Sequence, residues 1–209
     1  MKKIESSFKK RIAIDVDGTI ANQCKGAIEY IEKIMGLEVI TEPEEIDTWN
    51  HIIETKTENI LLSDFFKEKI LDERLVYIMK PFNGVVKEIG DLAKKHHIKI
   101  ITSRREESKD YTINWLKNNK IKYHEFCTTK RKAKCKLDVD ILIEDDPYAT
   151  LLTAKENEEK LVILISRPYN INTKWMNKDE LDFNKQIKNG RIKRMGKWSE
   201  ITSYILNLD

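Results

Sequence analysis

The chain has 209 residues, of which 40% are hydrophobic and 35% charged, a composition typical of an ordered globular domain with or without a smaller insertion. Its 38 Lys and Arg residues barely outnumber its 35 Asp and Glu residues, a balance that does not point to a nucleic-acid polymer as partner. Three cysteines without a CxxC pair, no secretory apolar region and no apolar run long enough for a membrane span predict a reducing, cytoplasmic location.

The first apolar run, residues 11–16, predicts a buried strand, and an insertion follows it. Residues 22–80 contain helical patterns but no convincing strand. The first of these helices, near residues 26–35, carries an apolar stripe and ends at Gly36, and Thr41 with Glu44 resembles a capping box. We therefore predict a small helical cap at residues 22–80, inserted into a core formed by residues 1–21 and 81–209.

After the cap, apolar runs again alternate with helical patterns, which indicates an α/β domain with a largely parallel sheet. The predicted strands cover residues 98–102, 121–126, 139–144, 161–165 and 191–195. Apolar residues at three- and four-residue spacing predict helices at residues 85–95, 111–118 and 148–157. A last helix, capped by Ser199, is expected to run to Leu206.

Two carboxylates follow the first strand in the segment Asp15-Val16-Asp17-Gly18-Thr19. Ligands bind at the carboxyl ends of the strands in open α/β sheets, so this position suits chemistry. A carboxylate at Asp15 can attack phosphorus and form a covalent intermediate, and Asp17 is placed to protonate the leaving alcohol and then to activate water. The alternative is an ordinary turn after a strand, where Asp and Gly are common for conformational reasons.

Two further strand ends carry groups that suit a phosphate and a cation. Thr102 and Ser103 offer hydroxyls to phosphate oxygens, although such residues also cap helices. Glu144 and Asp145 place adjacent acids where an apolar run meets solvent, and like charges there call for a cation. Mg²⁺ fits, because it prefers oxygen ligands and takes one or two carboxylates together with substrate phosphate. Asp15, Asp145 and the backbone carbonyl of Asp17 form the predicted ligand set.

A run of basic residues lies between the second and third of these strand ends. We expect one of its lysines to point into the site and offset the charge of the phosphate and of Asp15, whereas the others form a solvated face. The candidates are Lys130, Lys132, Lys134 and Lys136.

In this order, the four elements resemble the haloacid dehalogenase superfamily of phosphohydrolases. The resemblance implies a Rossmann-like core with helices on both faces of the sheet. It also implies a nucleophile at Asp15, an acid/base at Asp17, a phosphate contact from Thr102, and Mg²⁺ held by Asp15, Asp17 and Asp145. A second Asp at position 17 favours phosphate ester hydrolysis, since superfamily members that attack carbon or pump ions usually lack it.

More narrowly, ITSR at residues 101–104, TINWL at 112–116, IEDDP at 143–147 and RPYN at 167–170 resemble bacterial relatives of the 5′(3′)-deoxyribonucleotidases. This resemblance implies a nucleoside monophosphate as substrate, with Arg104 and Glu144 supporting the site. Among the lysines it favours Lys132, which precedes Ala133 in a familiar context. The sequence leaves open whether the aromatic residues of the cap stack on a base or hold the cap together. It also leaves open whether Tyr169-Asn170 line the site or anchor a loop.

The residues exclude several other mechanisms and leave three hypotheses. The chain has no HxxH or HExxH zinc pattern and no GxxxxGK[ST] loop. The first hypothesis is a nucleotidase-like phosphomonoesterase, the second a phosphatase of sugar phosphates or other small metabolites, and the third a binding or regulatory protein that keeps the site without useful turnover. The oligomeric state is not specified by the sequence.

Overall fold

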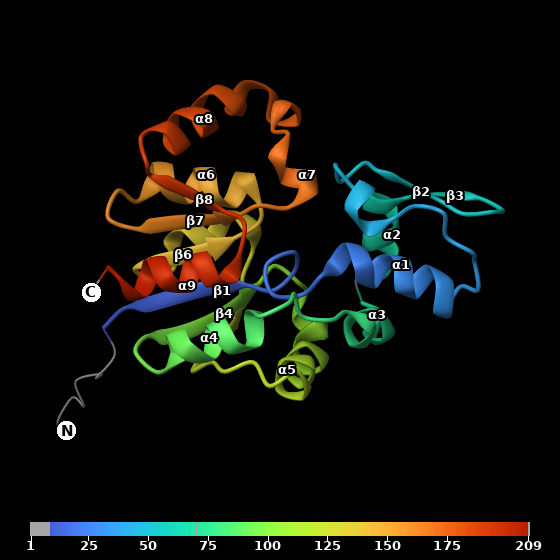
Figure 1. Ribbon diagram of the computed structural model, residues 1–209, viewed down its shortest axis with the longest axis horizontal. Coiled ribbons are helices and arrows are strands. Elements are labelled where there is room, and N and C mark those ends of the chain that lie inside the picture. The colour runs from blue at the N-terminus through green and yellow to red at the C-terminus, as the bar shows by residue number, and fades with distance from the viewer. Residues whose placement is uncertain (1–8, 70, 209) are drawn as a thin grey trace.

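A computed structural model describes residues 9–69 and 71–208. Within this described part, six strands form one parallel sheet in the order β5-β4-β1-β6-β7-β8 (Figure 1). The prediction of a largely parallel α/β core is confirmed. The strands are β1 (Arg11–Asp15), β4 (His97–Thr102), β5 (Glu125–Thr128), β6 (Ile141–Glu144), β7 (Leu161–Ile165) and β8 (Ile192–Met195).

Helices cover both faces of the sheet because alternate residues of its buried strands point in opposite directions. In β7, Ile163 and Ile165 share a hydrophobic cluster with Ile201, whereas Val162 and Leu164 share another with Phe183. Accordingly, α4 and α9 contact each other at one face, and α6 contacts α8 at the other. These helices are α4 (Val85–Ala93), α9 (Trp198–Leu206), α6 (Pro147–Glu156) and α8 (Glu180–Lys188).

The remaining core elements lie in the connections between strands. They are η2 (Glu106–Ser108), α5 (Lys109–Asn118), η3 (Arg131–Lys136), α7 (Pro168–Ile171) and η4 (Lys174–Asp179). The helix α8 and the short helix α7 are absent from the predicted elements. Ser199 lies inside α9 rather than at its cap, because the helix already begins at Trp198.

The predicted insertion, residues 22–80, stands to one side of the sheet in Figure 1. It contains α1 (Gln23–Lys33), η1 (Pro43–Glu45), β2 (Ile52–Glu54), β3 (Asn59–Leu61), α2 (Leu62–Lys69) and α3 (Glu73–Ile78). The antiparallel pair β2–β3 corrects the expectation that this segment lacks strands. Each strand has only three residues with mostly exposed side chains, so neither shows a clear apolar alternation.

The predicted capping box at Thr41 and Glu44 is also corrected. The Thr41 hydroxyl instead accepts a hydrogen bond from the backbone N–H of Glu54 at 2.8 Å, and so ties the loop to β2. The backbone N–H of Glu42 donates to the Glu45 carboxylate at 2.9 Å, at the start of η1. The box is therefore present one residue later than the sequence indicates.

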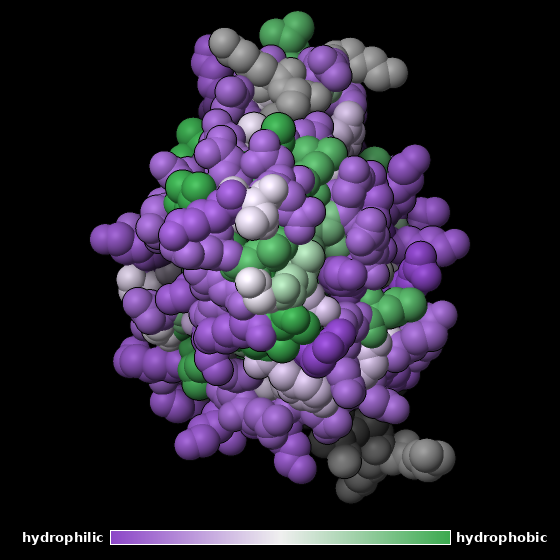
Figure 2. Space-filling view, turned by 90° about the vertical axis from the view of Figure 1, so that its right-hand side faces the viewer, coloured by the Kyte–Doolittle hydropathy of each residue, from purple (hydrophilic) through white to green (hydrophobic). Residues whose placement is uncertain are grey.

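Figure 2 faces the end of the molecule that carries the cap and shows a mainly hydrophilic surface with a strip of hydrophobic residues. Cap residues with exposed large hydrophobic side chains are Ile34, Met35, Ile40, Ile52, Leu61, Leu71 and Tyr77. Such side chains are ordinary on protein surfaces, so they do not by themselves define a partner surface. In the described part of the chain, no helix has both the length and the apolar character needed to cross a bilayer.

The two chain segments that lead into and out of the cap run side by side. Ala21 and Pro81 form an antiparallel bridge, and the Phe82 N–H donates to the Ile20 carbonyl at 2.9 Å. On the core side, the buried indole of Trp115 donates to the Met79 carbonyl at 2.8 Å. This hydrogen bond fixes the end of the cap to α5.

We expect Trp115→Phe to lower the free energy of unfolding by about 2–4 kcal/mol, because it leaves the buried Met79 carbonyl without its donor and opens a cavity. Denaturant titration measures this loss. Tyr77→Phe, at a cap side chain that is 40% exposed, is the control and should change stability by less than about 0.5 kcal/mol. Equal effects of the two substitutions would contradict the anchoring role of the indole.

Candidate active site

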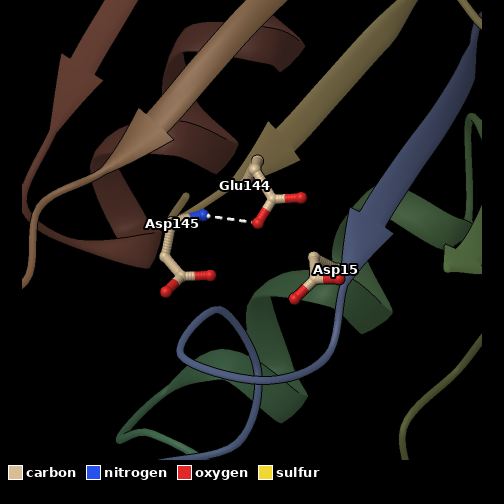
Figure 3. Close-up of side chains that lie close together, drawn as sticks. All are labelled: Asp15, Glu144 and Asp145. Atoms are coloured by element: carbon tan, nitrogen blue, oxygen red, sulfur yellow. Dashed lines mark hydrogen bonds between the residues drawn. The ribbon is translucent and has the colours of Figure 1, made fainter. Parts of the chain in front are cut away.

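Three neighbouring strands bring the candidate residues to one edge of the sheet. Asp15, Thr102 and Glu144 are the last residues of β1, β4 and β6. These strands are adjacent and parallel, with β1 in the middle. Figure 3 shows the carboxylates of Asp15, Glu144 and Asp145 gathered at the ends of β1 and β6. The structure thus brings together the strand-end acids predicted from the sequence.

Lys134, rather than Lys132, provides the buried ammonium of this site. Its Nζ donates to Oδ1 of Asp15 at 2.7 Å and to Oε2 of Glu144 at 2.6 Å. Lys132, the lysine favoured by the family resemblance, is exposed and lines a different cavity from the one that contains Asp15. The cause is local: η3 is a 3₁₀ helix, and its turn directs Lys134 to the sheet edge and Lys132 to solvent.

Asp145 is held by groups from two distant segments. Its carboxylate accepts hydrogen bonds from the Thr19 hydroxyl at 3.1 Å and from the Tyr169 hydroxyl at 2.7 Å. The Asn170 side-chain amide donates to the backbone carbonyl of Asp145 at 2.8 Å. Tyr169-Asn170 therefore anchor the site itself, which joins the two interpretations that the sequence leaves open.

Glu144 and Asp146 have supporting positions. Glu144 Oε1 accepts from the backbone N–H groups of Asp145 and Asp146 at 3.1 and 3.2 Å, so its carboxylate shapes the turn after β6. The Asp146 side chain accepts from the Tyr148 N–H at 2.9 Å as the N-cap of α6, and also pairs with Arg131. Asp146 thus begins the helix, as Asp before Pro often does.

Negative charge exceeds positive charge in this cluster. Oxygen atoms of Asp15, Glu144 and Asp145 lie within 4.8 Å of one another, and all three residues are buried. Burial, followed by repulsion from Glu144, raises the pKa of Asp15 well above its usual range, although Lys134 opposes the shift. Burial, Glu144 and Asp15 likewise raise the pKa of Asp145. One ammonium for three carboxylates is a donor set that fits a bound divalent cation.

Lys134 is firmly charged in this setting. Burial disfavours its ammonium, but Asp15 and Glu144 outweigh burial and raise its pKa. The charged ammonium offsets part of the negative charge of these two acids, and Asp145 adds further negative charge beside them. The cluster therefore still attracts a second positive partner.

Asp17 lies on the loop after β1, and its carboxylate faces Arg104. The guanidinium donates to both carboxylate oxygens, from Nε at 2.8 Å and from Nη2 at 2.6 Å. Arg104 is itself fixed, because its Nη1 donates to the Thr112 hydroxyl at 3.0 Å. The Asp17 carboxylate is not part of the acidic cluster of Asp15, Glu144 and Asp145. The contact of Asp17 with a cation stays a prediction.

Thr102 and Ser103 lie beside this pair with different exposure. Thr102 is buried, and its hydroxyl oxygen accepts from the Arg104 N–H at 3.2 Å, which leaves the hydroxyl proton available to donate. Ser103 is exposed and lines the same cavity as Asp15 and Asp17. Ser103 is thus open to a ligand in this cavity, whereas Thr102 does not line it. The phosphate contacts of both residues stay predictions.

The site opens into a cavity of about 270 Å³ between the core and residues 22–80. The aromatic side chains Trp49 and Phe66 line it from the cap, with ring centroids 5.9 Å apart. The ring centroids of Trp49 and Tyr169 are 4.9 Å apart, and the Tyr169 hydroxyl donates a hydrogen bond to Asp145. Aromatic groups of the cap thus reach the acidic cluster through a single intervening ring.

The match to a family model shows that the chain is a haloacid dehalogenase-like hydrolase, and the parallel sheet with strand-end carboxylates and a buried lysine fits that class. Within that class, the chain belongs to the family described as 5′ nucleotidase, deoxy (Pyrimidine), cytosolic type C protein, whose model matches residues 9–205. Its sequence is 25% identical over 170 residues to "Putative nucleotidase BH1399" of Halalkalibacterium halodurans, an alignment that covers 78% of this chain and 82% of that protein.

Solved structures share the fold. A haloacid dehalogenase-like hydrolase, SP0104 from Streptococcus pneumoniae, superposes with a TM-score of 0.54 at 15% identity, covering 95% of this chain and 99% of that one. A hydrolase of the same superfamily from Deinococcus radiodurans, solved with bound phosphate and sodium, gives a TM-score of 0.55 at 10% identity, covering 97% of each chain. At these identities the likeness concerns the fold.

We expect Lys134→Met to lower the free energy of unfolding by about 3–5 kcal/mol at neutral pH, because it leaves buried carboxylates without their cation. The deficit should shrink as the pH falls. A carboxyl whose folded-state pKa exceeds its unfolded-state pKa binds a proton more readily in the folded state and so favours folding in acid. Denaturant titrations at several pH values measure this. Lys132→Met is the matched control, and an equal loss there would contradict the assignment.

Gly18 is the second test of the site. Its φ is +74°, and a Cβ would collide with the Asp145 carboxylate and the Tyr169 hydroxyl. Gly36 has the same φ of +74°, but a Cβ there would meet nothing within 4 Å, so it isolates the backbone strain of roughly 1–2 kcal/mol. We expect Gly18→Ala to lose more stability than Gly36→Ala and also to lose hydrolase activity. Equal unfolding midpoints with activity retained would refute the close approach.

Proposed function

We propose that the protein is a Mg²⁺-dependent phosphomonoesterase that acts through an aspartyl-phosphate on Asp15 and hydrolyses nucleoside monophosphates. The observation that carries this proposal is the Asp15 carboxylate, buried at the end of β1 and held at 2.7 Å by Lys134, beside Asp145 and next to Asp17. Family membership supports the reaction class, and the relative from Halalkalibacterium halodurans bears a nucleotidase name.

Asp15 is the proposed nucleophile. The Lys134 hydrogen bond aims one carboxylate oxygen and stabilises its charge against burial. Attack on phosphorus forms the Asp15–phosphorus bond and breaks the bond to the leaving alcohol oxygen. The hydroxyls of Thr102 and Ser103 and the Lys134 ammonium are the proposed donors to the phosphate oxygens.

Asp17 is the proposed acid and base. It gives a proton to the departing alcohol oxygen and later takes one from the water that attacks the aspartyl-phosphate, which releases phosphate and restores the Asp15 carboxylate. Arg104 donates to both oxygens of the Asp17 carboxylate, so proton transfer by Asp17 requires that this pair separate. A phosphate dianion in the same cavity is a competing partner for the guanidinium.

Bound Mg²⁺ would supply charge neutralisation at the phosphate, with the carboxylates of Asp15 and Asp145 and the backbone carbonyl of Asp17 as proposed ligands. The excess of buried carboxylates over ammonium groups supports this choice.

We also propose a cytoplasmic location, in keeping with Cys24, Cys127 and Cys135, which are free thiols.

The aromatic lining supports a nucleoside as the leaving group. Trp49 and Phe66 offer ring faces and edges to a planar base in the cavity that contains Asp15 and Asp17. Stacking on aromatic side chains contributes about 1–3 kcal/mol per base and does not depend on base identity. A sugar phosphate has no planar group that would use these rings.

Steady-state hydrolysis of p-nitrophenyl phosphate, with Mg²⁺ and with a chelator, tests the chemistry. We expect activity only with the metal, and a loss of about 10³-fold or more in Asp15→Asn, which has no nucleophilic carboxylate. Asp182→Asn, at a surface carboxylate that pairs with Lys155, should keep full activity. Robust turnover by Asp15→Asn would rule out covalent catalysis at that residue.

A panel of nucleoside monophosphates and sugar phosphates then tests the substrate, and equal kcat/KM values for both classes would refute the nucleotide assignment.

A further inference from the structure

Arg167 is a half-buried cation whose hydrogen bonds go to backbone carbonyls rather than to a carboxylate. Its Nε donates to the Gly18 carbonyl at 2.6 Å, and its Nη2 donates to the Thr19 carbonyl at 3.3 Å. Within residues 9–69 and 71–208, no carboxylate lies within salt-bridge distance of its guanidinium. Withdrawing a guanidinium from water without an ion-pair partner is unfavourable, so the carbonyls that it binds call for a functional explanation.

Those carbonyls belong to the loop that directly follows Asp17. The Thr19 carbonyl accepts a second hydrogen bond from the Trp198 indole at 3.1 Å. Gly18 adopts a φ of +74° and packs against Asp145, so the two peptide groups after Asp17 are fixed by donors on one side and by close packing on the other. The position of the Asp17 carboxylate depends on this loop.

The other face of Arg167 contacts the segment that returns from the cap. Its guanidinium carbon lies 3.5 Å from the centroid of the Phe82 ring, which is a close cation–π contact. Phe82 in turn donates its N–H to the Ile20 carbonyl at 2.9 Å, and Ala21 forms a bridge with Pro81. A single side chain therefore touches both segments that connect the cap to the core.

We propose that Arg167 is a positioning residue that holds the loop after Asp17 against the two segments that connect the cap to the core. It thereby fixes the position of the Asp17 carboxylate relative to the cap. This proposal rests on the proposed role of Asp17. Arginine suits the task because its planar fork donates to two adjacent carbonyls while its flat face stacks on a ring, a combination that the compact ammonium of lysine does not offer. Arg167→Lys is therefore not a conservative replacement here.

The first experiment measures the lock without using activity. Amide hydrogen exchange of Arg167→Met should be about tenfold faster than in the wild type at Ile20, Ala21 and Phe82, with unchanged exchange in β6. Arg167→Lys should behave in the same way. Arg191→Met is the matched control, because Arg191 also donates to a backbone carbonyl, that of Asn157, but lies away from the loop. Faster exchange throughout the chain, or an unchanged exchange rate at the three amides, would overturn the proposal.

The second experiment measures the consequence for Asp17. p-Nitrophenolate leaves without a proton, whereas the alkoxide of a nucleoside monophosphate needs one, so loss of a well-placed acid affects the nucleotide more. We expect Arg167→Met to lower kcat/KM for the nucleotide about tenfold more than kcat/KM for p-nitrophenyl phosphate. Asp17→Asn should show the same asymmetry more strongly, and Arg191→Met should show none.

The outcomes separate this proposal from the proposed function. An equal loss on both substrates in Arg167→Met, with the asymmetry preserved in Asp17→Asn, would show that Arg167 is only structural while the phosphatase mechanism stands. A wild-type protein without phosphatase activity would refute the function, and the exchange experiment would still decide whether Arg167 locks the loop to the cap connections.

Discussion

The ammonium of Lys134, between Asp15 and Glu144, is the interaction on which the site depends. Asp15 and Glu144 are the last residues of adjacent strands, and the parallel register of β1 and β6 places them beside each other. Without a cation between them, two charged carboxylates would be buried at close range. The segment that carries the ammonium is fixed in its turn by the buried Lys160, whose Nζ donates to the carbonyls of Cys135 and Leu137 at 2.8 and 2.7 Å.

Buried and half-buried cations have different tasks in the core. Lys134 balances acids, whereas Lys160 and Arg167 bind backbone carbonyls and so hold the segments that present the functional groups. Arg104 binds the Asp17 carboxylate itself. Because these cations are bound to particular partners, the three carboxylates of the cluster keep more negative charge than Lys134 offsets. An excess of buried acid is costly in the free protein and becomes favourable when a cation binds.

Local pattern is sufficient to predict the strand-end acids, because an apolar run followed by Asp or Glu fixes both the strand and the edge at which it ends. The lysine is different. Lys132 and Lys134 are residues of the same type, two positions apart in one basic segment. Only the tight turn of η3 decides which of them faces Asp15. The β2–β3 hairpin escapes prediction because three-residue strands show almost no alternation. The hydrogen bond of Tyr169 to Asp145 joins residues 24 positions apart, and no local signal carries such a contact.

The arrangement also separates the chemistry from the choice of substrate. Asp15, Lys134 and Asp145 are positioned by the sheet, by η3 and by the segment after β7, none of which belongs to residues 22–80. Trp49 and Phe66 belong to the insertion and meet the cluster only across Tyr169 and the cavity. On the proposed function, a change at Trp49 or Phe66 would alter the fit of the leaving group without removing a hydrogen-bond partner of these charges. The connections at Ala21 and Pro81, with the ring of Phe82 beside them, are where a movement of the cap would reach the Asp17 loop.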